Sequence, residues 1–228
     1  MSAERLFVAL DQPTLAEALA LVAQLEPLVL RYKVGLELFS AVGPMSVRAL
    51  VERGAEVLLD LKLHDIPETV RRAARVAMTS GAKWLTVHTE GGPAMLRAAV
   101  AGAQPAQVLG VTVLTSLDLE DLEAVGTRVG GMEELVVQRA RLALDAGCAG
   151  VIASPREVGA LRAALGKDFL IVTPGVRPAS TGSHDDQKRT ATPGAAIAAG
   201  ASAVVVGRPI RDAPEPRAVA AALLEELG

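Results

Sequence analysis

The feature that most constrains the fold of this 228-residue chain is a regular alternation of short apolar runs with longer segments of helical periodicity. Such runs are typical of buried strands, and apolar residues three and four apart are typical of helices. The expected strands are residues 6–10, 29–35, 57–63, 84–88, 108–114, 150–153, 169–173 and 203–206. The expected helices are residues 13–25, 44–53, 67–80, 93–101, 119–125, 133–146, 154–165, 192–199 and 216–227.

About eight β-then-α units in one chain is the pattern of an α/β fold in which a parallel sheet closes into a (β/α)8 TIM barrel. No break in composition marks a linker, so we expect a single barrel domain over residues 1–228. The main competitor is a doubly wound open sheet. No G-x-G-x-x-G sequence opens a helix here, which disfavours that competitor.

The bulk composition excludes several classes of function. The aromatic fraction is 2% and the net charge is −3, so the chain offers neither a stacking platform nor a basic surface for nucleic acid. The single cysteine, Cys148, fits a reducing compartment. The apolar run at residues 194–207 is shorter than a membrane span, and the first residues lack a secretion-signal pattern. We therefore expect a cytoplasmic protein without nucleic-acid or membrane partners.

The stretch from residue 58 to 70, L-L-D-L-K-L-H-D-I-P-E-T-V, places charge where a barrel core would be apolar. Asp60 and Lys62 are two apart, so in a strand they share one face and the leucines between and around them share the other. One interpretation is a structural ion pair that fills the barrel mouth. The other is a functional site, because burying charge is costly unless it is paired.

The residues after this strand have an ordinary structural interpretation. The pattern D-I-P-E predicts a helix capping box, with Asp65 as the cap and Glu68 three residues later. His64, between strand and helix, is interpreted as a packed or solvated histidine.

In a barrel of this kind the active site lies at the C-terminal ends of the strands. An alternating array of lysines and aspartates there could keep the lysines ionised and direct a proton at a substrate atom. The polar residues expected at this end are Asp11, Lys33, Asp60, Lys62, Asp65, His88, Thr115 and Arg208, with Arg177 and Gln187 in the loop after the seventh strand.

Gly207 and Arg208 follow the eighth strand, and Arg177 follows the seventh. Each arginine alone is typical of a solvated surface charge. Phosphate sites in these barrels use the loops after strands seven and eight and a short helix N-terminus. Glycine lets backbone N–H groups approach an anion, and arginine donates forked hydrogen bonds. Together these residues predict a phosphate site.

The sequence D-L-K-L-H-D-I-P at residues 60–67 carries the pattern D-x-K-x-x-D-I-P, and the chain resembles the bacterial type of orotidine 5′-phosphate decarboxylase. The supporting matches are A-L-D at 9–11, K-V-G-x-E-L-F at 33–39, L-T-S at 114–116, T-P-G-x-R at 173–177, D-Q at 186–187 and V-V-V-G-R at 204–208.

The resemblance implies decarboxylation of orotidine 5′-phosphate to UMP and CO₂, the final step of de novo pyrimidine synthesis, without metal or cofactor. It implies that Lys62 donates the proton to C6, that Asp60 lies near the substrate carboxylate, and that Lys33 completes the charged array. It also implies that Asp65 enters the neighbouring subunit's site, so the working form is a homodimer with shared active sites.

The resemblance further implies substrate contacts along the whole site. Asp11, Lys33 and Thr69 would contact the ribose, with Thr69 reaching across the interface, and Thr115 would contact the pyrimidine. Asp60, Asp65 and Ile66 are also counted among the substrate-binding residues. The expected phosphate contacts are Arg177, Gln187, Gly207 and Arg208.

Two alternatives stay open. One is a relative that uses the same motif with Mg²⁺ on 3-keto sugar phosphates or hexulose phosphates, where the acids would be metal ligands. Lys33, the H-D-I-P sequence and Gln187 weigh against it. The other is a non-catalytic barrel that binds a phosphorylated ligand. The presence of every residue that the chemistry needs weighs against that one.

Overall fold

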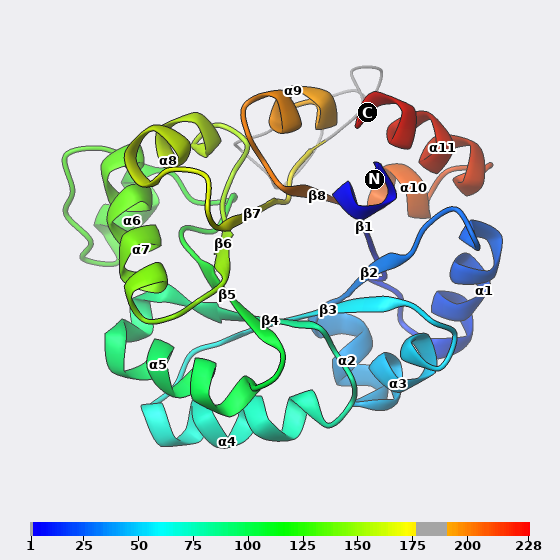
Figure 1. The fold of residues 1–228 in the computed structure, drawn as a ribbon, viewed down its shortest axis with the longest axis horizontal. Coiled ribbons are helices and arrows are strands. Elements are labelled where there is room, and N and C mark those ends of the chain that lie inside the picture. Colours follow the sequence, from blue (N-terminus) through cyan, green and yellow to red (C-terminus); the bar gives the residue numbers. More distant parts are fainter. Residues whose placement is uncertain (1, 177–190) are drawn as a thin grey trace.

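The part of the chain that the computed structural model describes, residues 2–176 and 191–228, forms a closed barrel of eight parallel strands in chain order (Figure 1). The predicted (β/α)8 TIM barrel is therefore confirmed. The strands are β1 (Leu6–Ala9), β2 (Arg31–Val34), β3 (Glu56–Leu63), β4 (Trp84–His88), β5 (Gln107–Val111), β6 (Gly150–Ile152), β7 (Leu170–Thr173) and β8 (Ala203–Val206).

Helices surround the barrel on the outside (Figure 1). They are α1 (Leu15–Leu25), α2 (Leu36–Val42), α3 (Met45–Val51), α4 (Pro67–Met78), α5 (Gly92–Ala103), α6 (Leu119–Ala124), α7 (Met132–Asp145), α8 (Val158–Leu165), α9 (Pro193–Ala198), α10 (Arg208–Arg211) and α11 (Pro216–Glu226), with short 3₁₀ turns η1 (Ser2–Arg5) and η2 (Thr89–Gly91). Among the described residues, no helix is both long and apolar enough to cross a bilayer.

Several predicted boundaries were wrong. The segment after β2 forms two helices, α2 and α3, divided at Gly43, whose φ of 62° ends the first one. The short helix α10 was not predicted as an element. Strand β5 ends at Val111 rather than residue 114, at the position where its pairing with both neighbours ends, opposite His88 of β4 and Ile152 of β6.

The barrel interior is closed at the N-terminal ends of the strands. Phe7 and Trp84 pack edge to face there, with ring centroids 5.2 Å apart. Arg31 lies over both rings and is paired with Glu56 at 2.8 Å. Because this end is filled by rings and paired charges, the space for a ligand is left at the opposite end of the barrel.

The pairing of β3 with β4 is irregular. Leu59 pairs with Leu85 and Leu63 with Val87, so β3 advances four residues while β4 advances two. Within this bulge Lys62 has a φ of 50°, a left-handed conformation that is uncommon for a side chain other than glycine. Simple alternation therefore does not hold across the whole strand, although Asp60 and Lys62 do face the same cavity.

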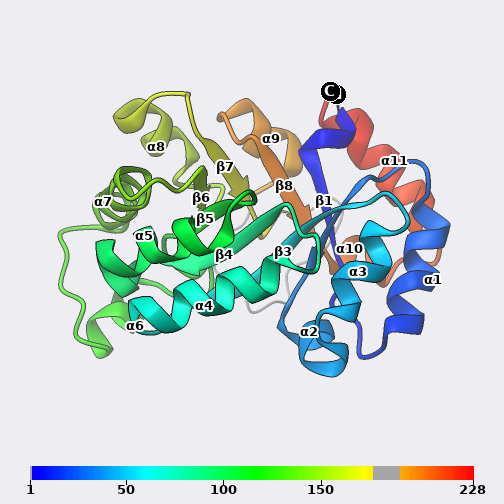
Figure 2. The same ribbon diagram turned by 60° about the horizontal axis from the view of Figure 1, so that its bottom comes forward.

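Helices α4 and α5 lie side by side along the outside of the barrel (Figure 2). Their close approach depends on Gly102 in α5. A Cβ atom at this position would lie 2.2 Å from the backbone oxygen of Arg71 in α4. Since that neighbour is backbone, it cannot move aside as a flexible side chain would.

We expect Gly102→Ala to lower the free energy of unfolding by about 1–3 kcal/mol, because the methyl group forces α4 and α5 apart. Urea unfolding measures this. The matched control is Gly159→Ala in α8, where an added Cβ would meet nothing within 4 Å. The free energy of unfolding of this control is expected to rise by about 0.5–1 kcal/mol, because alanine favours a helix more than glycine does. Equal effects of the two substitutions would contradict this account of the α4–α5 contact.

Candidate active site

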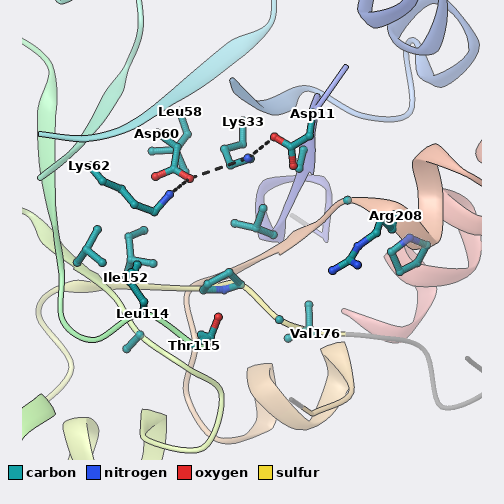
Figure 3. A pocket seen from close by; sticks show the side chains of 18 of the residues that line it. Asp11, Lys33, Leu58, Asp60, Lys62, Leu114, Thr115, Ile152, Val176 and Arg208 are labelled. Carbon is teal, nitrogen blue, oxygen red and sulfur yellow. Dashed lines mark hydrogen bonds and ion pairs between the residues drawn. The ribbon is translucent and has the colours of Figure 1, made fainter. Parts of the chain in front are cut away.

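A cavity of about 610 Å³ opens at the C-terminal ends of the strands, where the sequence predicted the site (Figure 3). Seven of the predicted site residues line it: Asp11, Lys33, Asp60, Lys62, Thr115, Gly207 and Arg208. The cavity has a charged side and an apolar side. The apolar side is formed by Val111, Val113, Leu114 and Ile152.

The charged side is a row of alternating sign that crosses three neighbouring strands (Figure 3). Lys33 Nζ donates a hydrogen bond to Asp11 Oδ1 at 2.7 Å. Lys62 Nζ donates to Asp60 Oδ2 at 2.7 Å, and Lys33 Nζ lies 3.9 Å from the same oxygen. One carboxylate oxygen of Asp60 thus lies between two ammonium groups, and the row reads Asp11, Lys33, Asp60, Lys62.

Asp60 remains ionised in this setting. Burial raises the pKa of its carboxyl. The charges of Lys62 and Lys33 and the hydrogen bonds from Lys62 and Thr86 lower the pKa by more than burial raises it, so it lies below its ordinary value. The Asp60 side chain is only 13% exposed. A shielded anion with two adjacent cations can fix both lysine side chains without help from solvent.

Thr86 in β4 belongs to this arrangement and was missed from the sequence. The Lys62 backbone N–H donates to Thr86 Oγ1 at 2.9 Å, and Thr86 Oγ1 donates to Asp60 Oδ1 at 2.8 Å. In the sequence Thr86 is typical of a strand residue. The one available signal was a hydroxyl two positions before His88, on the strand that follows the charged stretch.

Gly35 is a second residue that sequence reasoning did not assign to the site. A Cβ atom here would lie 2.7 Å from both Asp11 Oδ1 and Lys33 Nζ. Any larger residue would therefore displace the Asp11–Lys33 ion pair. The signal was present in the K-V-G sequence, since glycine there directly follows the strand that carries Lys33.

The far end of the cavity is formed by Gly207 and Arg208, which follow β8, and by Gly175 and Val176, which follow β7 (Figure 3). Arg211, also missed from the sequence, lines this end and donates from Nη1 to the Asp11 backbone oxygen at 2.8 Å. This bond ties α10 to the loop after β1. The predicted phosphate residues Arg177 and Gln187 lie outside the described residues.

Asp65, Ile66 and Thr69 are exposed at the start of α4, and the described cavity lining does not include them. The predicted capping box was wrong. Ile66 is the N-cap, and the Asp65 carboxylate accepts instead from the Ile66 N–H at 2.6 Å. The Glu68 carboxylate does not accept from the backbone at the start of the helix, because it bonds to Arg71 and Arg72 in the same helix.

The two histidines near this region stay outside the described lining of the cavity. His64 is exposed, as its ordinary interpretation expected, and its ring lies 5.6 Å from that of His88. Burial, opposed by Glu90, lowers the pKa of His88 below its ordinary value, and the nearby His64 and Lys62 lower it further. His88, predicted at the mouth, is therefore neutral near pH 7.

Within the described residues, no three His, Cys, Asp or Glu side chains gather as a metal site.

Comparison with known proteins fits this geometry. The model of the "Orotidine 5'-phosphate decarboxylase / HUMPS family" matches residues 4–223. The chain belongs to this family. A protein of Anaeromyxobacter sp. (strain K) named orotidine 5'-phosphate decarboxylase is 55% identical over 221 residues, covering 96% of each chain. One of the same name from Moorella thermoacetica is 48% identical, covering 98% of this chain and 92% of its own.

The likeness extends to solved structures of the family. The crystal structure of orotidine 5'-phosphate decarboxylase from Lactobacillus acidophilus matches with a TM-score of 0.87 and 36% sequence identity. The match covers 99% of both chains. The family therefore applies to the whole barrel rather than to one part of it.

The lowered pKa of Asp60 predicts an acid-dependent loss of stability. Because the folded-state pKa lies below the ordinary 3.8, ionised Asp60 stabilises the fold above about pH 4, and this contribution disappears as the pH falls through the folded-state pKa. Urea unfolding between about pH 5 and pH 2 should show a steeper loss in the wild type than in Asp60→Asn. Parallel pH curves for the two proteins would contradict the assignment.

Proposed function

We propose that this chain decarboxylates orotidine 5′-phosphate to UMP and CO₂, the final step of de novo UMP synthesis. We propose that it does so as one barrel domain in the cytoplasm, without a metal or cofactor. The observation that carries the proposal is the placement of Lys62 Nζ, held 2.7 Å from Asp60 and facing the cavity. The activity named for the relatives at 55% and 48% identity supports it.

The difficult part of this reaction is the charge left at C6. Loss of CO₂ places an electron pair in an orbital of the ring plane, where the ring cannot delocalise it. An ammonium group fixed in advance stabilises that charge without reorganisation and then supplies the proton. Lys62 suits this role, since its ion pair with Asp60 at 2.7 Å holds the side chain in position beside the cavity.

Asp60 and the apolar side of the cavity have complementary roles. Asp60 would lie near the substrate carboxylate, so the repulsion between these two negative charges decreases when CO₂ leaves. The side formed by Val111, Leu114 and Ile152 keeps water from the reacting atoms and suits uncharged CO₂. Lys33, between Asp11 and Asp60, would bind the ribose together with Asp11, and Thr115 would contact the pyrimidine.

The phosphate would bind at the far end of the cavity, at Gly207 and Arg208. A Cβ at Gly207 would lie 3.3 Å from the Ala9 Cβ, a tight contact that glycine avoids. Arg177 and Gln187, which lie outside the described residues, would be the other phosphate contacts. Binding energy at a remote phosphate orients the reacting ring and can raise turnover as well as affinity.

We also propose a homodimer with shared active sites. Asp65, Ile66 and Thr69 are exposed on the surface at the start of α4, and Ile66 is 68% exposed. An apolar side chain with acidic and hydroxyl neighbours fits a contact surface better than bulk solvent. Asp65 and Thr69 would then complete the partner's site.

The charged row also argues against the Mg²⁺-dependent alternative. A divalent cation at Asp60 would meet the ammonium groups of Lys62 and Lys33 at close range, and like charges repel.

The decisive assay mixes purified protein with orotidine 5′-phosphate in excess EDTA and follows the loss of the orotate chromophore. We expect full turnover. Absence of turnover, or turnover that appears only with Mg²⁺, would refute the proposal.

The role of Lys62 predicts a selective defect. Lys62→Ala should lower decarboxylation by at least about a thousandfold, because both charge stabilisation and the proton are lost. Binding of UMP, measured by calorimetry, should remain. The control Lys83→Ala removes an exposed lysine at the other end of the barrel and should keep wild-type turnover. Near-wild-type turnover by Lys62→Ala would show that the assignment of the proton donor is wrong.

Shared sites predict complementation between inactive variants. Mixing Asp65→Ala and Lys62→Ala subunits creates heterodimers with one intact site, which should restore roughly a quarter of wild-type activity. The control mixes Lys33→Ala with Lys62→Ala. Both lysines line one cavity, so no heterodimer site is intact and no activity should return. If the Asp65→Ala mixture stays as inactive as the control, Asp65 does not act across the interface.

A further inference from the structure

We propose that Thr86 is a positioning residue of the decarboxylase site, whose single hydroxyl fixes both the Lys62 backbone and the Asp60 carboxylate. The inference rests on the proposed function for its kinetic consequence. Its geometric basis is independent of that function. It depends on three observations about the β3–β4 junction.

The first observation is that Thr86 lies where the strand pairing is interrupted. Regular pairing stops after Leu59 with Leu85 and resumes at Leu63 with Val87. Lys62 lies in this gap in a left-handed conformation, which costs free energy for a side chain other than glycine and persists only where the surroundings fix it. The hydrogen bond from the Lys62 N–H to Thr86 Oγ1, at 2.9 Å, holds the backbone in that conformation.

The second observation concerns the single proton of the hydroxyl. Thr86 Oγ1 accepts from Lys62, so its own proton is available for Asp60 Oδ1, 2.8 Å away. This bond occupies Oδ1 and leaves Oδ2 for Lys62 Nζ at 2.7 Å and Lys33 Nζ at 3.9 Å. Thr86 thereby sets the rotation of the Asp60 carboxylate, so that both ammonium groups face Oδ2 rather than Oδ1.

The third observation is burial. Thr86 is 0% exposed, so solvent does not readily replace its hydroxyl. Removing it leaves the Lys62 N–H and Asp60 Oδ1 without this partner beside the charged row, and buried polar groups without partners shift to recover one. The expected response is a displacement of Lys62 Nζ from the position in which it reaches C6.

The kinetic test compares Thr86→Val, which keeps the shape and removes the hydroxyl, with Thr86→Ser, which keeps the hydroxyl. We expect kcat to fall about a hundredfold in Thr86→Val with KM changed only a few-fold, and Thr86→Ser to recover most of kcat. The matched control is Thr89→Val, which removes another buried hydroxyl, one that donates to the Val111 backbone oxygen at 2.9 Å. It should lose stability but keep kcat.

Wild-type kcat in Thr86→Val, or equal impairment of Thr86→Ser and Thr86→Val, would overturn the inference. If Thr86→Val does not fold, Thr86→Ala removes the same hydroxyl without steric demand, and the same two outcomes apply. Failure of the wild type to decarboxylate would refute the proposed function, and the positioning role is then decided by a measurement that needs no turnover.

That measurement is an NMR titration of the Asp60 carboxyl carbon in the unliganded protein. Asp60 is faced by Lys62 on its own strand, by Lys33 from β2 and, beyond Lys33, by Asp11 after β1. These charges are the same in all the variants. The pKa of Asp60 should be higher in Thr86→Val than in the wild type and in Thr86→Ser, because a donor to the carboxylate is lost. An unchanged pKa in Thr86→Val would overturn the positioning role.

Discussion

The buried carboxylate of Asp60 is the group on which the site depends. Its Oδ2 lies between the ammonium groups of Lys62 and Lys33, and its Oδ1 accepts from Thr86. Two cations placed beside a ligand cavity would repel each other without an anion between them. A buried ionisable group without a partner of opposite charge shifts its pKa and becomes neutral. The four charges of the row are therefore stable only together.

The barrel supplies what such a set requires. Parallel strands bring the ends of β1, β2 and β3 together, so residues far apart in sequence form one row (Figure 3). Rings and paired charges close the opposite end, which confines the cavity to the side where the row lies. Pairing is irregular at the bulge in β3, where Lys62 has a left-handed backbone and its side chain lines the cavity. A strained backbone conformation of this kind persists only where the surrounding contacts fix it.

The barrel and most of the described site were predictable, because period-two and period-3.6 patterns and charges at strand ends are local signals. Asp11, Lys33, Asp60 and Lys62 were found in this way. Thr86 and Gly35 were not, since their roles arise from contacts between strands that no local pattern records. The capping box failed for a different reason, local competition: Glu68 bonds to Arg71 and Arg72, three and four residues later on its own helix, and Asp65 accepts from the adjacent Ile66 N–H.

Asp60 is an anion that orders two ammonium groups while Thr86 occupies its other oxygen. Neutron diffraction from deuterium-exchanged crystals grown near pH 7 would test it most directly, because it locates the exchangeable protons. We expect no deuteron on either Asp60 oxygen, three on Lys62 Nζ, and a Thr86 hydroxyl deuteron directed at Asp60 Oδ1. A deuteron on Asp60, or a Thr86 hydroxyl directed away from it, would contradict the account.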